Sequence, residues 1–175
     1  SEIRKKIKKI KKIKKKFDTK KQGEIISKLD FSLTSDQTKT LNEINDDLCS
    51  DNKMFRLLQG DVGSGKTIVS LLSAFNTINS DFQVAVMAPT EILSRQHFLL
   101  AKKIFPENIK IELLSGKSTY KNKKIILDKL LKKEIDIIFG THALFQKKVE
   151  FKKLGLIIID EQHKFGVSQR KKLSD

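Results

Sequence analysis

The stretch "QGDVGSGKTIVSLL", residues Gln59–Leu72, decides the fold, because it places three glycines and a lysine directly before an apolar run with helical spacing. The residues before it, "MFRLL" at 54–58, are typical of a short buried strand. A strand, a glycine loop and a helix in this order are the context that a phosphate-binding loop requires. The pattern is G-x-x-x-x-G-K-T, filled by Gly60, Gly65, Lys66 and Thr67. A chance glycine turn is the alternative, and the flanking strand and helix disfavour it.

The residue types in this loop suit the phosphates of a nucleotide. Without side chains at Gly63 and Gly65, successive main-chain N–H groups can surround an anion, and the N-terminus of the following helix adds partial positive charge. Lys66 can then reach the β and γ phosphates, while the Thr67 hydroxyl can bind the Mg²⁺ that bridges them. The sequence therefore predicts a site for a nucleotide and Mg²⁺.

The length and composition bound the class of protein. The chain has 175 residues, which is enough for one domain with its own core, and it is 38% apolar and 33% charged. No apolar run approaches the roughly 18 residues of a membrane span, and no signal peptide is evident. Cys49 is the one cysteine, so an internal disulfide is excluded. We expect a cytoplasmic protein that does not act in a membrane.

The net charge of +15 is concentrated near the start of the chain, where positions 1–22 hold Arg4 and eleven lysines against Glu2 and Asp18. A basic excess suggests nucleic acid or an anionic surface as a partner. The alternative is compositional bias, since most of the basic residues are lysine.

The same segment has an apolar stripe at helical spacing, which predicts a basic amphipathic helix packed against protein. The stripe consists of Ile3, Ile7, Ile10, Ile13 and Phe17. We expect a linker between Asp18 and Glu24, and we divide the chain into a basic connector at 1–22 and a domain at 23–175.

From Phe31 onward, strands and helices alternate. The capping-box spacing of Thr34 and Gln37 opens the first helix of this part. Such alternation predicts an α/β fold, a parallel sheet flanked by helices. The predicted helices cover 34–48, 66–79, 91–105 and 121–133, and the predicted strands cover 54–59, 83–88, 109–114, 135–140 and 154–160.

The strand "LIIID" ends on two adjacent carboxylates, Asp160 and Glu161. Its unbroken apolar run is typical of a strand covered on both faces. Asp160 can hold Mg²⁺ through a water, and Glu161 can orient and deprotonate the water that attacks the γ phosphate. A solvated turn is the alternative, and the phosphate loop makes it the weaker one.

Two further segments, "MAPTEILSRQH" and "FGTHALF", also begin at strand ends. Their threonines and main-chain N–H groups suit nucleic-acid phosphates, although ordinary strand-to-helix turns explain them equally well. The histidines His97, His142 and His163 lie in these motifs without metal-site spacing, so zinc is not expected.

Together these motifs resemble the first RecA-like domain of superfamily 2 helicases, and within them the RecG family, which remodels branched DNA. The resemblance runs from Phe31 to the end of the chain. "GDVGSGKT" resembles motif I, "APTEILSRQH" motif Ia, "GTHALF" motif Ib and "DEQHKFGV" motif II. Ser64 and Gln162 favour RecG over the transcription-repair coupling factor, the alternative family. Lys164 departs from the usual arginine.

The resemblance implies roles for single residues. Gln37 matches the glutamine that contacts adenine, and Gln162 and His163 would couple the γ phosphate to the DNA-contacting motifs. Contacts to the DNA backbone are implied for Pro89, Thr90, Gly140 and Thr141. Nucleotide contacts are implied for Gly60, Gly63, Ser64, Gly65, Lys66 and Thr67, with Lys66 and Glu161 as the catalytic residues and Thr67 and Asp160 at the metal.

The resemblance also implies ATP and Mg²⁺ as cofactors, and branched or forked DNA as the partner of a monomeric helicase. A second RecA-like domain, with an arginine finger, and a wedge domain are then expected in the full-length protein. The first domain would be incomplete at its C-terminus, with a gap between the strands of motifs I and II. By itself it would be inactive, and a binding module without hydrolysis is the alternative for the isolated chain.

Overall fold

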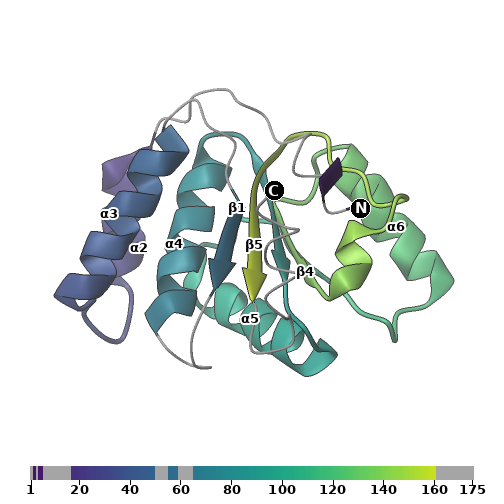
Figure 1. The fold of residues 1–175 in the computed structure, drawn as a ribbon, viewed down its shortest axis with the longest axis horizontal. Coiled ribbons are helices and arrows are strands. Elements are labelled where there is room, and N and C mark those ends of the chain that lie inside the picture. The colour runs from purple at the N-terminus through teal and green to yellow at the C-terminus, as the bar shows by residue number, and fades with distance from the viewer. Residues whose placement is uncertain (1, 3, 6–16, 50–54, 59–64, 161–175) are drawn as a thin grey trace.

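The structure, a computed structural model, describes residues 2, 4, 5, 17–49, 55–58 and 65–160. In this part of the chain, five strands form one sheet in the order β1-β5-β2-β4-β3 (Figure 1). All four neighbouring pairs are parallel. The strands are β1 Phe55–Leu58, β2 Gln83–Met87, β3 Ile111–Leu114, β4 Ile137–Gly140 and β5 Leu154–Asp160. The predicted α/β fold with a parallel sheet is confirmed.

Helices cover both faces of the sheet (Figure 1). They are α2 Thr19–Ser27, α3 Ser35–Cys49, α4 Gly65–Asn79, α5 Glu91–Ile104, α6 Tyr120–Leu131 and the 3-10 helix η1 His142–Phe145. Helices α3 to α6 lie where the sequence predicted them, whereas α2 and η1 were not predicted. No helix in the described ranges combines the length and apolarity needed to cross a membrane.

The sheet separates two hydrophobic cores. In β5, Leu156 and Ile158 pack into the core shared with α2, α3, α4 and α5, while Ile157 and Ile159 pack into the core shared with α6 and η1. Successive side chains of a strand point to opposite faces. Asp160, two residues after Ile158, therefore belongs to the face covered by α4 and α5.

The predicted gap at the centre of the sheet is wrong. β1 pairs directly with β5, in a register that runs from Phe55 opposite Ile157 to Leu58 opposite Asp160. A gap would leave the main-chain N–H and C=O groups of both strands without partners, which is costly inside a protein. Direct pairing of the two strands satisfies these groups.

Helix α2 occupies the place of the predicted linker between Asp18 and Glu24, so that prediction is also wrong. The Asp18 carboxylate caps the helix by accepting hydrogen bonds from the main-chain N–H groups of Lys20 at 3.0 Å and Lys21 at 3.3 Å. Glycine inside a helix costs about 1 kcal/mol relative to alanine. Burial of Ile25 in the core offsets this cost at Gly23. The division of the chain at residue 22 runs through α2 and stays a prediction. Most of the apolar stripe before it lies outside the described residues.

Three amide side chains join α2, α3 and α4. Nδ2 of Asn45 donates to Oε1 of Gln22 at 2.8 Å, and Nδ2 of Asn76 donates to the same oxygen at 2.6 Å. Asn76 also donates to Oδ1 of Asn45 at 3.0 Å. Asn76 is buried, so these bonds compensate the desolvation of its Nδ2 group, whereas its Oδ1 atom has no hydrogen-bond partner among the described residues. The bonds to Gln22 join α2 to α3 and α4.

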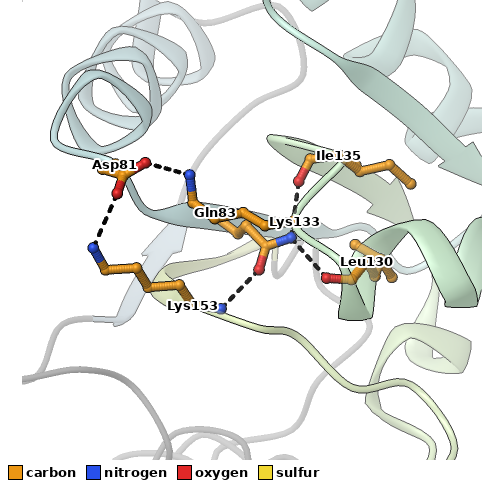
Figure 2. A network of polar contacts seen from close by, with 6 residues as sticks. All are labelled: Asp81, Gln83, Leu130, Lys133, Ile135 and Lys153. Atoms are coloured by element: carbon orange, nitrogen blue, oxygen red, sulfur yellow. Dashed lines mark hydrogen bonds and ion pairs between the residues drawn. The ribbon is translucent and has the colours of Figure 1, made fainter.

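A buried glutamine closes the end of the sheet at which the strands begin (Figure 2). Gln83 is fully buried, and its Nε2 donates to the carbonyl oxygens of Leu130 at 3.0 Å and Ile135 at 2.9 Å. Its Oε1 accepts from the main-chain N–H of Lys153 at 2.8 Å. One side chain thereby joins the end of α6 to the segments that enter β4 and β5.

Asp81 extends this network at the surface (Figure 2). Its carboxylate forms ion pairs with Lys133 and with Lys153, the latter at 3.3 Å. Both Asp81 and Lys133 have positive φ angles, 73° and 61°. The hydrogen bond from Lys133, helped by Lys153, holds the pKa of Asp81 below its ordinary value of 3.8.

Candidate functional site

The strands end together at one edge of the sheet. Leu58 at the end of β1 pairs with Asp160 at the end of β5, and Met87 at the end of β2 pairs with both Ile159 and Gly140. The segments after β1, β2, β4 and β5 carry the predicted motifs, so all of them start at this edge. Ligands of parallel α/β sheets bind beyond the carboxyl ends of the strands.

The predicted phosphate loop leads into α4, which begins at Gly65. Lys66 is exposed at the second position of this helix, and Thr67 is half-buried beside it. From Ile68 to Ile78 every residue of α4 is buried. The helix is therefore fixed in the core, and its N-terminus can offer N–H groups and partial positive charge to an anion at the strand ends.

Gln37 lies against the start of α4. A side chain at Gly65 would meet it, because a Cβ atom there would lie 1.5 Å from Nε2 of Gln37. The other end of the same amide, Oε1, accepts the main-chain N–H of Thr34 at 2.8 Å, and Thr34 Oγ1 accepts the N–H of Gln37 at 3.1 Å. The predicted capping box is confirmed, and it holds the amide against Gly65. The adenine contact of Gln37 stays a prediction.

Asp160 and His97 form a buried pair at this edge. Nε2 of His97 lies 2.7 Å from Oδ2 of Asp160, and their side chains are only 7% and 4% exposed. A carboxylate oxygen accepts hydrogen bonds, so the imidazole nitrogen is the donor. Among the described residues, Asp160 is the one buried acidic side chain. The sequence predicted that Asp160 holds Mg²⁺ through a water, and it gave no role to His97.

Two periodicities could have revealed the partner. Ser94, His97 and Ala101 are the buried residues of α5, spaced by three and four, and they define the face turned to the sheet. The alternation along β5 turns Asp160 to the same side as Ile158, which is the side that α5 covers. A histidine on the inner face of that helix was thus a candidate partner for the carboxylate.

The residues at this edge fit a nucleotide with Mg²⁺. In the part of the chain that the structure describes, no group of three or more His, Cys, Asp or Glu could hold a metal ion. Mg²⁺ commonly binds to one or two protein oxygens, with phosphates and waters as its other ligands. The Asp160 carboxylate and the Thr67 hydroxyl can each supply an oxygen to such a site.

The segment after β2 forms the cap of α5. Oγ1 of Thr90 accepts the main-chain N–H of Leu93 at 3.2 Å, which makes Thr90 the N-cap residue. The next residue, Glu91, accepts the main-chain N–H of Gly116 through Oε1 at 2.8 Å. Helix α5 is therefore tied to the loop after β3. Pro89 and Thr90 are half-buried, and their contact with DNA stays a prediction.

The segment after β4 is packed tightly. A Cβ atom at Gly140 would lie 2.8 Å from Cγ of Leu144, and the carbonyl oxygen of Gly140 accepts the N–H of Ala88 at 2.9 Å. Thr141 is buried and makes no side-chain cap for η1. Packing already accounts for the glycine, and the DNA contacts of Gly140 and Thr141 stay predictions.

Several predicted site residues lie outside the described residues. They are Gly60, Gly63, Ser64, Glu161, Gln162 and His163. Of the positions that flank them, Leu58 pairs with Asp160, and Gly65 begins α4.

Comparison with known proteins identifies the class. The family model described as DEAD/DEAH box helicase matches residues 34–175. The match covers most of the chain, and the chain therefore belongs to the DEAD/DEAH box helicase family.

Within this class, the chain is similar to proteins named ATP-dependent DNA helicase RecG. It is 52% identical to the protein of Streptococcus pneumoniae over 147 residues, which are 84% of this chain and 22% of that protein. It is 46% identical to the protein of Thermotoga maritima over 172 residues, 98% of this chain and 22% of that protein. The chain thus spans about a fifth of the length of these relatives.

Solved structures agree with this similarity. The structure of RecG bound to a three-way DNA junction has a TM-score of 0.81 and 45% sequence identity, and the match covers 94% of this chain and 23% of that one. The UvsW helicase from bacteriophage T4 has a TM-score of 0.57 at 17% identity, covering 91% of this chain and 56% of that one. The second likeness supports the fold alone.

Proposed function

We propose that this chain is the first motor domain of an ATP-dependent DNA helicase of the RecG type, which acts on branched DNA in recombination and repair. One observation carries the proposal: the pairing of Leu58 with Asp160, which brings the strand end that precedes the phosphate-loop sequence beside the acidic end of β5. The identity to proteins named RecG favours this family over the transcription-repair coupling factor.

In this proposal, residues of motifs I and II have separate roles in the binding and hydrolysis of ATP. Lys66 binds the β and γ phosphates from the start of α4, and Thr67 and Asp160 provide oxygens for the metal. Glu161 orients and deprotonates the attacking water. When bound, Mg²⁺ neutralises charge on the phosphates. Gln37 contacts adenine, and the other nucleotide contacts come from Gly60, Gly63, Ser64, Gly65, Gln162 and His163.

DNA would bind beside the nucleotide, at the segments that follow β2 and β4. The proposed contacts to its backbone are Pro89, Thr90, Gly140 and Thr141. The three-way junction bound by the RecG relative supports branched DNA as the substrate. The full-length protein would be a cytoplasmic monomer that also contains a second RecA-like domain and a wedge domain.

The test uses the full-length protein with ATP and either a three-way junction or a linear duplex of the same length. We expect junction DNA to stimulate ATP hydrolysis and ATP to drive strand separation at the junction. An absence of hydrolysis with either DNA would contradict the helicase proposal. Equal stimulation by both DNAs would contradict a helicase of the RecG type, although it would still agree with a DNA-dependent ATPase.

A further inference from the structure

The contact between His97 and Asp160 joins two segments that lie 63 residues apart in the sequence. His97 belongs to α5, and Asp160 is the last residue of β5. Both side chains are buried, and their atoms Nε2 and Oδ2 are 2.7 Å apart. A distance this short is typical of a hydrogen bond to an ionised carboxylate.

Packing alone does not explain a histidine at this position. The neighbouring residues on the inner face of α5 are the small side chains of Ser94 and Ala101. The buried Oγ atom of Ser94 has no hydrogen-bond partner among the described residues, whereas the buried His97 side chain is hydrogen-bonded to the Asp160 carboxylate. A buried carboxylate is costly without a donor. The His97 side chain therefore stabilises the buried carboxylate of Asp160 by donating a hydrogen bond to it. Asp160 is the residue proposed to hold the metal.

We infer that His97 is a positioning residue for Asp160, the carboxylate that holds Mg²⁺ in the proposed function, and the inference rests on that function. The hydrogen bond to Oδ2 fixes the rotation of the carboxylate, so that its orientation toward the metal is set before nucleotide binds. Residues that orient a metal-binding carboxylate typically change metal affinity by about 10- to 100-fold when they are replaced. The same bond connects the proposed metal ligand to α5, the helix that Thr90 caps.

Two substitutions separate positioning from packing. In His97→Gln, the amide Nε2 is as many bonds from the main chain as the imidazole Nε2, and it can donate to Asp160. In His97→Asn, the amide nitrogen corresponds to Nδ1 and falls short of the carboxylate. Ser94→Ala is the matched control, because it changes the same buried face of α5 without touching the pair.

The experiment measures Mn²⁺ affinity by electron paramagnetic resonance in the full-length protein with a non-hydrolysable ATP analogue. We expect His97→Asn to raise the dissociation constant for Mn²⁺ by about 10- to 100-fold. His97→Gln and Ser94→Ala should stay within about threefold of the unmodified protein, and nucleotide affinity without metal should not change in any variant.

The outcomes distinguish this inference from the function on which it rests. Equal Mn²⁺ affinity in the Gln and Asn variants would overturn the positioning role, even where both variants lose thermal stability. An unmodified protein that fails to bind Mn²⁺ with the nucleotide would overturn the proposed function together with the inference. Thermal unfolding of each variant shows whether a loss of affinity reflects a loss of fold.

Discussion

The two ends of the sheet hold their buried polar groups in different ways. At the end where the strands begin, the Gln83 amide donates to Leu130 and Ile135 and accepts from Lys153 (Figure 2). At the end where the strands finish, the partner that the structure describes for the Asp160 carboxylate is His97. An ionised carboxylate can accept about four hydrogen bonds. At the first end, both polar atoms of the Gln83 amide have main-chain partners, whereas at the second end the one partner found among the described residues is the side chain of His97.

This difference indicates that one end of the sheet stabilises the fold and the other end takes part in the chemistry. The amide of Gln83 connects the end of α6 to the segments that enter β4 and β5, and its three partners are main-chain groups whose positions follow from the fold. Asp160 pairs with Leu58, the last residue of the strand that precedes the phosphate-loop sequence. We therefore expect substitutions at the Gln83 end to change stability, and substitutions at the Asp160 end to change chemistry.

The largest expected effect is on chemistry. Lys66→Ala in the full-length protein should lower DNA-stimulated ATP turnover by about 10²- to 10³-fold, the usual loss when a single group that stabilises transition-state charge is removed. Because Lys66 is exposed, the thermal unfolding midpoint should not change. Steady-state hydrolysis at saturating ATP and DNA provides the measurement. Normal turnover would show that the loop does not bind the phosphates.

The next effect is on stability at the opposite end. Gln83→Leu removes the side-chain partners of the Ile135 carbonyl and the Lys153 N–H, whereas the Leu130 carbonyl keeps main-chain donors from Lys133 and Lys152. Loss of both partners, at the buried Ile135 carbonyl and the partly buried Lys153 N–H, costs about 3 kcal/mol together. Hydrogen exchange in the full-length protein should show faster exchange at the start of β5.

The Gln83→Leu variant also tests whether the two ends of the sheet differ in function. Nucleotide affinity in the presence of Mg²⁺ should remain unchanged in Gln83→Leu, because the substitution lies at the far end of the strands. Weakened nucleotide binding with unchanged exchange would mean that the two ends are not separate in function.

The smallest effect concerns Asp81. Its pKa is lowered mainly by the hydrogen bond from Lys133, so the carboxylate stabilises the fold fully at pH values above its ordinary pKa of 3.8. This stabilisation is lost as the pH falls through the lowered pKa of the folded state. Since the Asp81 side chain is 71% exposed, solvent screening limits the contribution to less than about 1 kcal/mol. Asp81→Asn should flatten the dependence of stability on pH below 4, as measured by thermal unfolding. An unchanged dependence would show that the Asp81 carboxylate does not stabilise the fold.

Local patterns predicted much of the fold. The capping box at Thr34 and Gln37, the helix after the glycine loop and the apolar run of β5 each depend on residues close in sequence, and these three predictions agree with the structure. The glycine loop itself, at 59–64, lies outside the described residues. The linker at 18–24 was wrong because the cap of Asp18 and the burial of Ile25 outweigh one helical glycine.

Contacts between distant segments account for the rest. The Gln83 amide bonds to groups 47 to 70 positions away, and His97 bonds to a residue 63 positions away, so no local motif contains either contact. The direct pairing of β1 with β5 depends likewise on the whole sheet. The roles of Asp160 and Lys66 were predicted from residue type, whereas the partner of Asp160 required the packing of α5.

The most direct test of the account compares the two carboxylates that follow β5. With the full-length protein, nucleotide affinity in the presence of Mg²⁺ and single-turnover hydrolysis are measured for Asp160→Asn and Glu161→Gln. If Asp160 holds the metal and Glu161 orients the attacking water, Asp160→Asn loses the Mg²⁺-dependent part of nucleotide binding, whereas Glu161→Gln binds normally and hydrolyses slowly. Equal loss of binding in both variants, or normal Mg²⁺ dependence in Asp160→Asn, would contradict the placement of the metal at the end of β5.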